Sequence, residues 1–221
     1  MEGENMKKGF VFDLDGVITD TAKFHYIAWK ELGESIGITI DLQFNEQLKG
    51  ISRMDSLDRI LAYGGKENDY TQEEKEAMAA KKNEAYVKLL DDLTPDDLLP
   101  GVKAFLDEAR EKKVPCSLAS ASKNAPFILK KLGVYDYFDA IVDPATLKKG
   151  KPDPEIFVRA AEMIDLDPSE AIGFEDAQAG VEGIKGAGMY AVGVEVSEPL
   201  TQADMTIKSF EEINVSDLLK L

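Results

Sequence analysis

Two aspartates stand two residues apart where a short apolar segment ends. Residues 9–12 are apolar and typical of a buried strand, and Asp13 and Asp15 come next. Side chains at positions i and i+2 can face the same side, so both carboxylates can serve one site, and Gly16 permits the sharp turn that exposes them. Such a pair suits nucleophilic and acid/base chemistry. The alternative is a pair of solvated loop aspartates.

A second apolar segment ends in acids in the same way. Residues 171–174 lead into Glu175 and Asp176, and a helical pattern follows them. Adjacent carboxylates repel one another unless a cation lies between them, and carboxylate oxygens in near-octahedral geometry suit Mg²⁺. The pattern therefore indicates a magnesium site, and a helix-capping acid is the alternative for Asp176.

Two further loops carry polar side chains after apolar segments. Residues 118–124 end in hydroxyl, ammonium and amide groups, for which the alternative is a helix N-terminus capped by Ser122 or Asn124. Residues 149–155 form a loop punctuated by prolines that contains Lys151. A solvated surface lysine is the alternative there.

These clusters need elements that bring them to one place. Short apolar segments predict strands at residues 9–13, 114–119, 139–142, 171–174 and 189–194, and the last four each follow a stretch of helical character. Strands that alternate with helices predict a parallel sheet covered on both faces, with any ligand at the carboxyl ends of the strands. Each of the polar clusters stands at such an end.

A helical insertion interrupts this pattern between residues 21 and 99. Further helices are predicted over residues 54–63 and 71–90, the latter beginning with a capping box at Thr71, and residues 91–100 return the chain to the sheet. The apolar residues with helical spacing in the first helix are Phe24, Ile27, Ala28 and Leu32.

We therefore predict an α/β protein. Its core is a Rossmann-like parallel sheet with covering helices, built from residues 1–20 and 95–221, and residues 21–94 form an inserted α-helical cap domain.

The acidic composition limits the possible partners. The 221 residues carry a formal net charge of -16, which argues against nucleic acid and anionic membranes because binding to phosphates requires clustered Lys and Arg. No apolar run approaches the roughly 20 residues of a spanning helix, and residues 1–5 do not resemble a signal peptide. The lone Cys116 is expected to be a buried thiol. We expect a monomer in the cytoplasm.

The motifs together resemble those of the haloacid dehalogenase superfamily of aspartate-nucleophile phosphotransferases. Residues 13–21, DLDGVITDT, follow that family's opening motif, hhhhDxDGhhhDT, in which h is hydrophobic. The resemblance implies that Asp13 accepts a phosphoryl group and that Asp15 is the general acid/base. It also implies that Ser120 holds the transferring phosphoryl group and that Lys151 neutralises the attacking carboxylate. The Mg²⁺ ligands that it implies are Asp13, the backbone carbonyl of Asp15, Glu175 and Asp176.

Within this superfamily the chain resembles the β-phosphoglucomutases, most closely over residues 44–57 and 119–127. The resemblance implies that β-glucose 1-phosphate and β-glucose 6-phosphate interconvert through β-glucose 1,6-bisphosphate, which primes the enzyme, while Asp13 carries the phosphoryl group. Two departures leave the substrate selectivity slightly open: Met54 replaces a common acid, and Ala125 replaces a common glycine.

Such a mutase needs a second cationic pocket, because it must hold a non-reacting phosphate away from the nucleophile. Arg53 on the cap and Lys123 on the core offer one, and arginine can bind phosphate through two parallel hydrogen bonds. His25 matches a cap histidine that the family couples to the general acid. The alternatives are an ordinary imidazole at His25 and a solvated helix-face charge at Arg53. The residues expected to bind substrate are Asp15, His25, Lys49, Gly50, Ile51, Arg53, Lys82, Ser120, Ala121, Ser122, Lys123 and Asn124.

Two other functions stay open at this point. A sugar-phosphate phosphatase would use the same Asp13 and Asp15 but transfer the phosphoryl group to water, and the paired phosphate sites argue against it. A phosphosugar-binding protein without turnover would not need Lys151 and Asp176 beside these aspartates.

Overall fold

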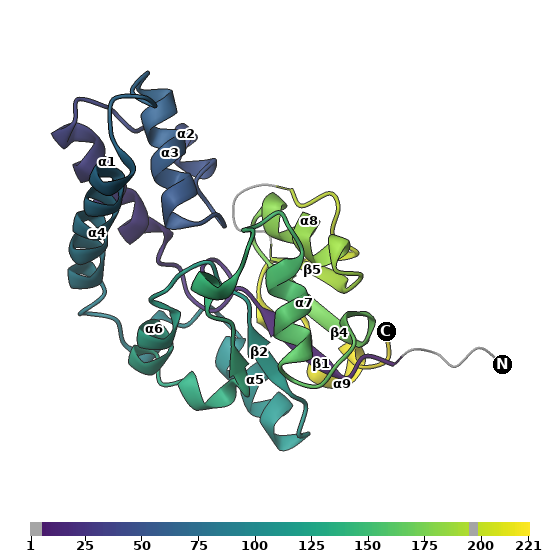
Figure 1. The fold of residues 1–221 in the computed structure, drawn as a ribbon. Coiled ribbons are helices and arrows are strands. Elements are labelled where there is room, and N and C mark those ends of the chain that lie inside the picture. Colours follow the sequence, from purple (N-terminus) through teal and green to yellow (C-terminus); the bar gives the residue numbers. More distant parts are fainter. Residues whose placement is uncertain (1–5, 195–198) are drawn as a thin grey trace.

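Six parallel strands form one sheet within the described residues, 6–194 and 199–221, of the computed structural model (Figure 1). Residues 1–5, with which the predicted core segment begins, and residues 195–198 lie outside that description. The strand order is β3-β2-β1-β4-β5-β6. The strands are β1 (Gly9–Phe12), β2 (Cys116–Leu118), β3 (Ala140–Ile141), β4 (Ala171–Glu175), β5 (Tyr190–Val194) and β6 (Met205–Ile207).

Along the chain, β2 and β3 are added on one side of β1, and β4, β5 and β6 are added on the other side, as in Rossmann-like folds. This change of direction places a crevice outside the carboxyl end of β1. Five of the strands were predicted from their apolar runs, and these predictions are confirmed. The sixth, β6, was missed because it has three residues and only Ile207 among them is buried. At the edge of the sheet such a short segment leaves no distinctive apolar pattern.

Both faces of the sheet are covered by helices. Phe10 and Phe12 of β1 lie in a hydrophobic cluster with α5, α6 and α9, whereas Val11 lies in a second cluster with α7 and α8. This burial on both sides explains why the strands are continuous apolar runs. The helices are α5 (Val102–Glu111), α6 (Ala125–Lys131), α7 (Glu155–Glu162), α8 (Gln178–Gly186) and α9 (Val215–Leu218). The short 3₁₀ helices are η1 (Pro95–Asp97), η2 (Tyr135–Tyr137), η3 (Pro144–Thr146), η4 (Pro168–Glu170) and η5 (Phe210–Glu212).

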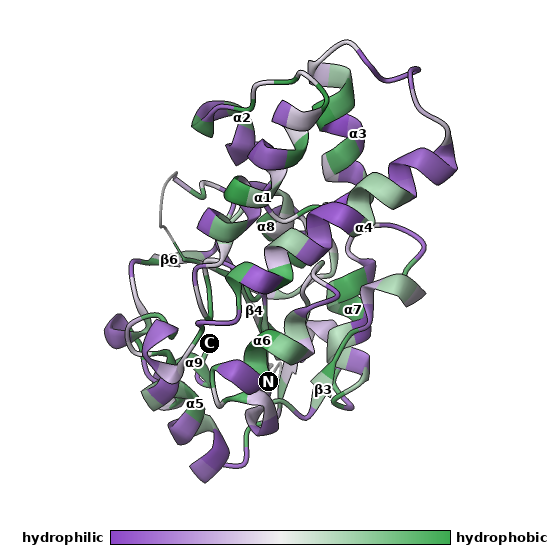
Figure 2. Cartoon of the chain, turned by 90° about the vertical axis from the view of Figure 1, so that its left-hand side faces the viewer, coloured by the Kyte–Doolittle hydropathy of each residue, from purple (hydrophilic) through white to green (hydrophobic). Residues whose placement is uncertain are grey.

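Four helices between β1 and β2 stand apart from the sheet (Figure 1). In the view of Figure 2, α2 and α3 lie at the end of the molecule far from α5 and α9. The four helices are α1 (Ala22–Ser35), α2 (Leu42–Glu46), α3 (Arg53–Tyr63) and α4 (Gln72–Leu89). Their own hydrophobic cluster contains Trp29, Leu32, Ile38, Ile40, Phe44, Leu48, Leu57, Ile60, Leu61 and Ala79. The insertion is therefore helical, as expected.

The predicted helix signals hold with one exception. At the start of α4, Thr71 accepts a hydrogen bond from Glu74 N and the Glu74 side chain accepts one from Thr71 N, which confirms the capping box. Ala28 and Leu32 of α1 are buried, but Ile27, assigned to the same apolar face, is 46% exposed. The buried face of α1 is therefore narrower than the positions of its apolar residues predict.

The two chain segments that join the helical part to the sheet run side by side. Thr19 Oγ1 donates to Asp97 O at 2.8 Å, and Leu99 N donates to Ile18 O at 2.9 Å. Hydrogen bonds therefore join the outgoing and the returning segment where the chain passes between the sheet and the helical part. No helix in the described part of the chain is long and apolar enough to cross a membrane.

Candidate active site

One cavity of about 480 Å³ lies between the helical part and the carboxyl ends of the strands. Lys151 and Glu175 do not line it; both are buried, Lys151 against Asp13 and Glu175 against Lys151. The predicted residues that line the cavity are Asp13, Asp15, His25, Lys49, Gly50, Ile51, Arg53, Lys82, Ser120, Ala121, Ser122, Lys123, Asn124 and Asp176.

Neighbouring strands bring the acids together. Phe12 of β1 pairs with Phe174 of β4, so Asp13, which follows β1, comes close to Glu175, the last residue of β4. Ligand atoms of Asp13, Glu175 and Asp176 lie within 4.8 Å of one another. Lys151 Nζ donates to Asp13 Oδ1 at 2.8 Å and also to Glu175 Oε1.

Burial is the largest single influence on the pKa values of this cluster. It raises the pKa of Asp13 to about 7; Lys151 opposes that shift and the charge of Glu175 adds to it. The pKa of Asp176 is also raised, by burial and then by the charges of Glu175 and Asp13. Burial alone would lower the pKa of Lys151, but the two carboxylates that it contacts outweigh burial and raise it, so the ammonium stays charged.

Glycine at position 16 allows the first loop to approach the second. Gly16 has φ 74°, which confirms the predicted sharp turn. A Cβ atom built there would overlap the carboxylate of Asp176. The two acidic loops can therefore pack this closely only with glycine at this position.

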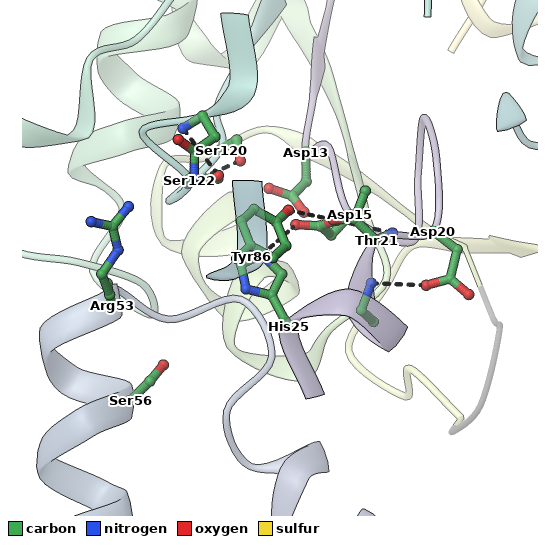
Figure 3. A network of polar contacts seen from close by, with 12 residues as sticks. Asp13, Asp15, Asp20, Thr21, His25, Arg53, Ser56, Tyr86, Ser120 and Ser122 are labelled. Atoms are coloured by element: carbon green, nitrogen blue, oxygen red, sulfur yellow. Dashed lines mark hydrogen bonds and ion pairs between the residues drawn. The ribbon is translucent and has the colours of Figure 1, made fainter. Parts of the chain in front are cut away.

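Asp15 is held in place by Thr21, the residue that precedes helix α1. Thr21 donates to Asp15 Oδ1 through its hydroxyl and, at 3.3 Å, through its backbone N–H (Figure 3). The Tyr86 hydroxyl lies 2.9 Å from Thr21 Oγ1 and must donate to it, because Thr21 has a single hydroxyl proton. Burial alone would raise the pKa of Asp15, but the nearby His25 and the hydrogen bonds from Thr21 outweigh burial and hold that pKa below its ordinary value.

His25 connects Asp15 to Lys82. His25 Nε2 lies 3.7 Å from Asp15 Oδ2, and Nδ1 lies 2.8 Å from Lys82 Nζ. Burial and the nearby Lys82 lower the pKa of His25, so its ring is neutral at pH 7. If Lys82 donates to Nδ1, the ring proton must be on Nε2, facing Asp15. Burial, and then the charge of Arg53, lower the pKa of Lys82 to about 7.

A second polar group lines the cavity away from the acids. Figure 3 shows Arg53 at the start of α3, with Ser120 and Ser122 on the core side. Ser120 is 3% exposed, and its Oγ accepts from Ser122 N at 3.2 Å. Asn83 Oδ1 accepts from Arg53 Nη2 and from Asn124 Nδ2, both at 2.8 Å. Asn124 stands at the start of α6, but its side chain does not cap that helix.

Several residues around the cavity were not found from the sequence. Tyr86 follows Lys82 by one helical turn of α4, so helical spacing could have indicated it. Trp29 lines the cavity, and Lys82 Nζ lies 4.3 Å from the centre of its ring. Asn83 gave no signal, because one more polar residue on a largely polar helix is unremarkable in the sequence.

The carboxylate cluster fits a divalent cation. Asp13, Glu175 and Asp176 supply three negative charges and Lys151 one positive charge, which leaves an excess of two when all are ionised. The donors are all oxygen atoms, as Mg²⁺ prefers. Glu175 is the most occupied of the three, since its Oε2 also accepts from Ala177 N at 2.9 Å.

Comparison with known proteins gives the family. The family model for haloacid dehalogenase-like hydrolases matches residues 7–188. The chain belongs to this family. It is 49% identical over 208 residues to the β-phosphoglucomutase of Bacillus subtilis (strain 168), which covers 94% of this chain and 92% of that protein. It is 32% identical over 189 residues to the fructose-1-phosphate phosphatase YqaB of Escherichia coli (strain K12), which covers 85% of this chain and 96% of that protein.

A solved structure agrees with this assignment. The crystal structure of β-phosphoglucomutase from Clostridium difficile matches with a TM-score of 0.94 and 46% sequence identity, covering 96% of each chain. The predicted fold class, the predicted enzyme class and the resemblance to β-phosphoglucomutases are therefore confirmed.

Proposed function

We propose that this enzyme interconverts β-glucose 1-phosphate and β-glucose 6-phosphate through β-glucose 1,6-bisphosphate. One observation carries the proposal: a single cavity is lined both by Asp13 and, apart from it, by cationic and amide donors for a second phosphate. Arg53 comes from the cap, and Lys123 and Asn124 come from the core. Figure 3 shows Arg53 well apart from Asp13. A bisphosphate has two phosphate groups, and this cavity offers one site for a phosphate at Asp13 and a second at Arg53, Lys123 and Asn124.

Asp13 and Asp15 share the chemistry. Asp13 attacks one phosphorus of the bisphosphate in line, the bond from that phosphorus to the sugar oxygen breaks, and Asp15 gives a proton to the departing oxygen. In the reverse step a sugar hydroxyl attacks the aspartyl phosphate, Asp15 takes the hydroxyl proton, and Asp13 is released. The lowered pKa of Asp15 keeps this carboxylate ionised at neutral pH, so that it can accept the hydroxyl proton.

The buried groups around Asp13 support the attack. Lys151 offsets the negative charge of the nucleophile, and Ser120 holds the transferring phosphoryl group. Mg²⁺ would be held by Asp13, the backbone carbonyl of Asp15, Asp176 and Glu175, and when bound it supplies positive charge at the phosphoryl oxygens.

Residues 21–94 act as a cap that closes over the sugar. Closure excludes water, which would otherwise hydrolyse the aspartyl phosphate. His25 and Lys82 then lie on the cap side of Asp15 and couple its position to the bound sugar. Lys49, Gly50 and Ile51 contribute the cap loop that contacts the sugar phosphate.

We place the enzyme in the cytoplasm as a monomer that acts on sugar phosphates. Its net charge of -16 argues against nucleic-acid and anionic-membrane partners, and it also means that the local cations must overcome a repulsive background.

The test is ³¹P NMR of β-glucose 1-phosphate with enzyme, Mg²⁺ and a trace of β-glucose 1,6-bisphosphate. Glucose 6-phosphate that accumulates well ahead of inorganic phosphate supports the mutase. Inorganic phosphate alone contradicts it and supports a sugar-phosphate phosphatase, the second candidate, which the similarity to a fructose-1-phosphate phosphatase favours. Asp13→Asn is the control, because both enzymes lose turnover without the nucleophile.

A further inference from the structure

Asn83 links the cap to the core where Arg53 and Asn124 meet. Its Oδ1 accepts hydrogen bonds from Arg53 Nη2 and Asn124 Nδ2, both at 2.8 Å. Arg53 begins cap helix α3, Asn83 lies on cap helix α4, and Asn124 immediately precedes core helix α6. One neutral oxygen therefore receives donors from both sides of the cleft.

The chemistry of the donors fixes the orientation of both amides. A guanidinium can only donate, so the Asn83 atom that faces Arg53 must be the carbonyl oxygen. That oxygen can only accept, so the Asn124 atom that faces it must be the amide nitrogen. The contact is a directed pair of hydrogen bonds rather than a chance approach of polar groups.

This arrangement leaves other donors for a ligand. The guanidinium of Arg53 has five N–H groups and the carboxamide of Asn124 has two, and the hydrogen bonds to Asn83 use one N–H from each. Both Arg53 and Asn124 line the cavity, as does Lys123. An anion in this part of the cavity can therefore take further N–H groups without displacing Asn83.

We propose that Asn83 is a positioning residue for the non-reacting phosphate of the substrate. Its carbonyl oxygen holds Arg53 and Asn124 in one geometry, so that their remaining N–H groups face a single anion. The inference rests on the proposed function. A neutral acceptor suits this role, because a carboxylate would neutralise Arg53 and repel the phosphate, and a shorter side chain would leave Arg53 without an orienting contact.

Three variants test the role: Asn83→Ala, Asn83→Asp, and Glu84→Ala as a matched truncation of an exposed residue on the same helix. Losing two orienting hydrogen bonds is expected to raise KM for β-glucose 1-phosphate by about 10- to 30-fold in Asn83→Ala, while kcat changes less than about threefold. Asn83→Asp is expected to raise KM at least as much. Glu84→Ala is expected to match the wild-type protein.

The Asp variant separates positioning from a simple tether. A carboxylate keeps both hydrogen bonds, so a mechanical link between cap and core would survive in Asn83→Asp, and a wild-type KM in that variant overturns the proposal. An unchanged KM in Asn83→Ala overturns it as well. Circular dichroism and thermal unfolding show whether each variant is folded, and the isosteric Asp variant serves if the Ala variant unfolds.

A double-mutant cycle tests whether Asn83 acts through Arg53. In an Arg53→Ala background, adding Asn83→Ala is expected to raise KM less than about threefold further, because one of the two groups that Asn83 positions is already gone and only Asn124 remains. An effect of Asn83→Ala that is as large without Arg53 as with it overturns the proposal.

A second readout keeps this inference separable from the proposed function. Release of inorganic phosphate from glucose 1,6-bisphosphate requires no transfer to a sugar, so the same KM series can be measured in this way. If the wild-type protein makes no glucose 6-phosphate, the proposed function fails. The ratio of KM values for phosphate release still decides whether Asn83 positions Arg53.

Discussion

Replacing Lys151 by methionine tests the charge balance of the buried acidic cluster. The side chain of Lys151 is 1% exposed and is hydrogen-bonded to Asp13 and Glu175, whose side chains are 6% and 0% exposed. Lys151→Met keeps most of the side-chain volume but leaves both carboxylates without their cation. Removing one partner of a buried ion pair costs about 3–5 kcal/mol of unfolding free energy.

That cost converts into a measurable shift in unfolding temperature. A chain of 221 residues has an unfolding entropy of about 0.5 kcal/mol/K, so the midpoint should fall by about 6–10 °C. The assay is calorimetry at pH 8 with a chelator, so that no metal replaces the lost charge. Lys149→Met is the matched control, because that lysine side chain is 74% exposed.

The pH dependence gives an independent check. The pKa of Asp13 is already raised from 3.8 to about 7, and loss of Lys151 raises it further. A group with a raised folded-state pKa loses its contribution to stability as pH rises through that pKa. The deficit of Lys151→Met should therefore be larger at pH 8 than at pH 5. An unfolding midpoint within about 2 °C of the Lys149→Met control at pH 8, or a deficit independent of pH, would refute the reasoning.

Three further results are expected. Gly16→Ala should weaken Mg²⁺ binding at least about tenfold in calorimetric titration, because the added Cβ would overlap Asp176. Gly37→Ala is the control and should leave binding unchanged, because Gly37 has a similar φ but open space around the added Cβ. Equal losses in the two variants would contradict the overlap argument. Burial raises the pKa of Cys116 to about 12, so Ellman's reagent at pH 8 should react only after unfolding, and rapid reaction in the native protein would contradict the structure. Thr71→Ala should cost about 1 kcal/mol of stability with unchanged kcat/KM; a loss of activity would show that the cap helix does more than support the cavity.

The sequence alone was enough for the parts that depend on local patterns. Apolar runs followed by acids located the ends of two strands to within one residue: β1 ends at Phe12, just before Asp13, and β4 ends at Glu175. Thr71 and Glu74 marked the start of α4, because a capping box is complete within four residues. Five of the six strands in the described residues, and the helical insertion, were predicted for the same reason.

Tertiary structure decided the contacts between distant segments. Lys151 and Asp13 are 138 residues apart, and Asn83 and Asn124 are 41 apart, yet each pair is hydrogen-bonded at 2.8 Å. No local pattern specifies such partners, because they depend on how the sheet and the cap pack. The sequence therefore determined which residues could do the chemistry. Only the packed structure decided that Lys151 is shared by two carboxylates and that Asn83 joins the cap to the core.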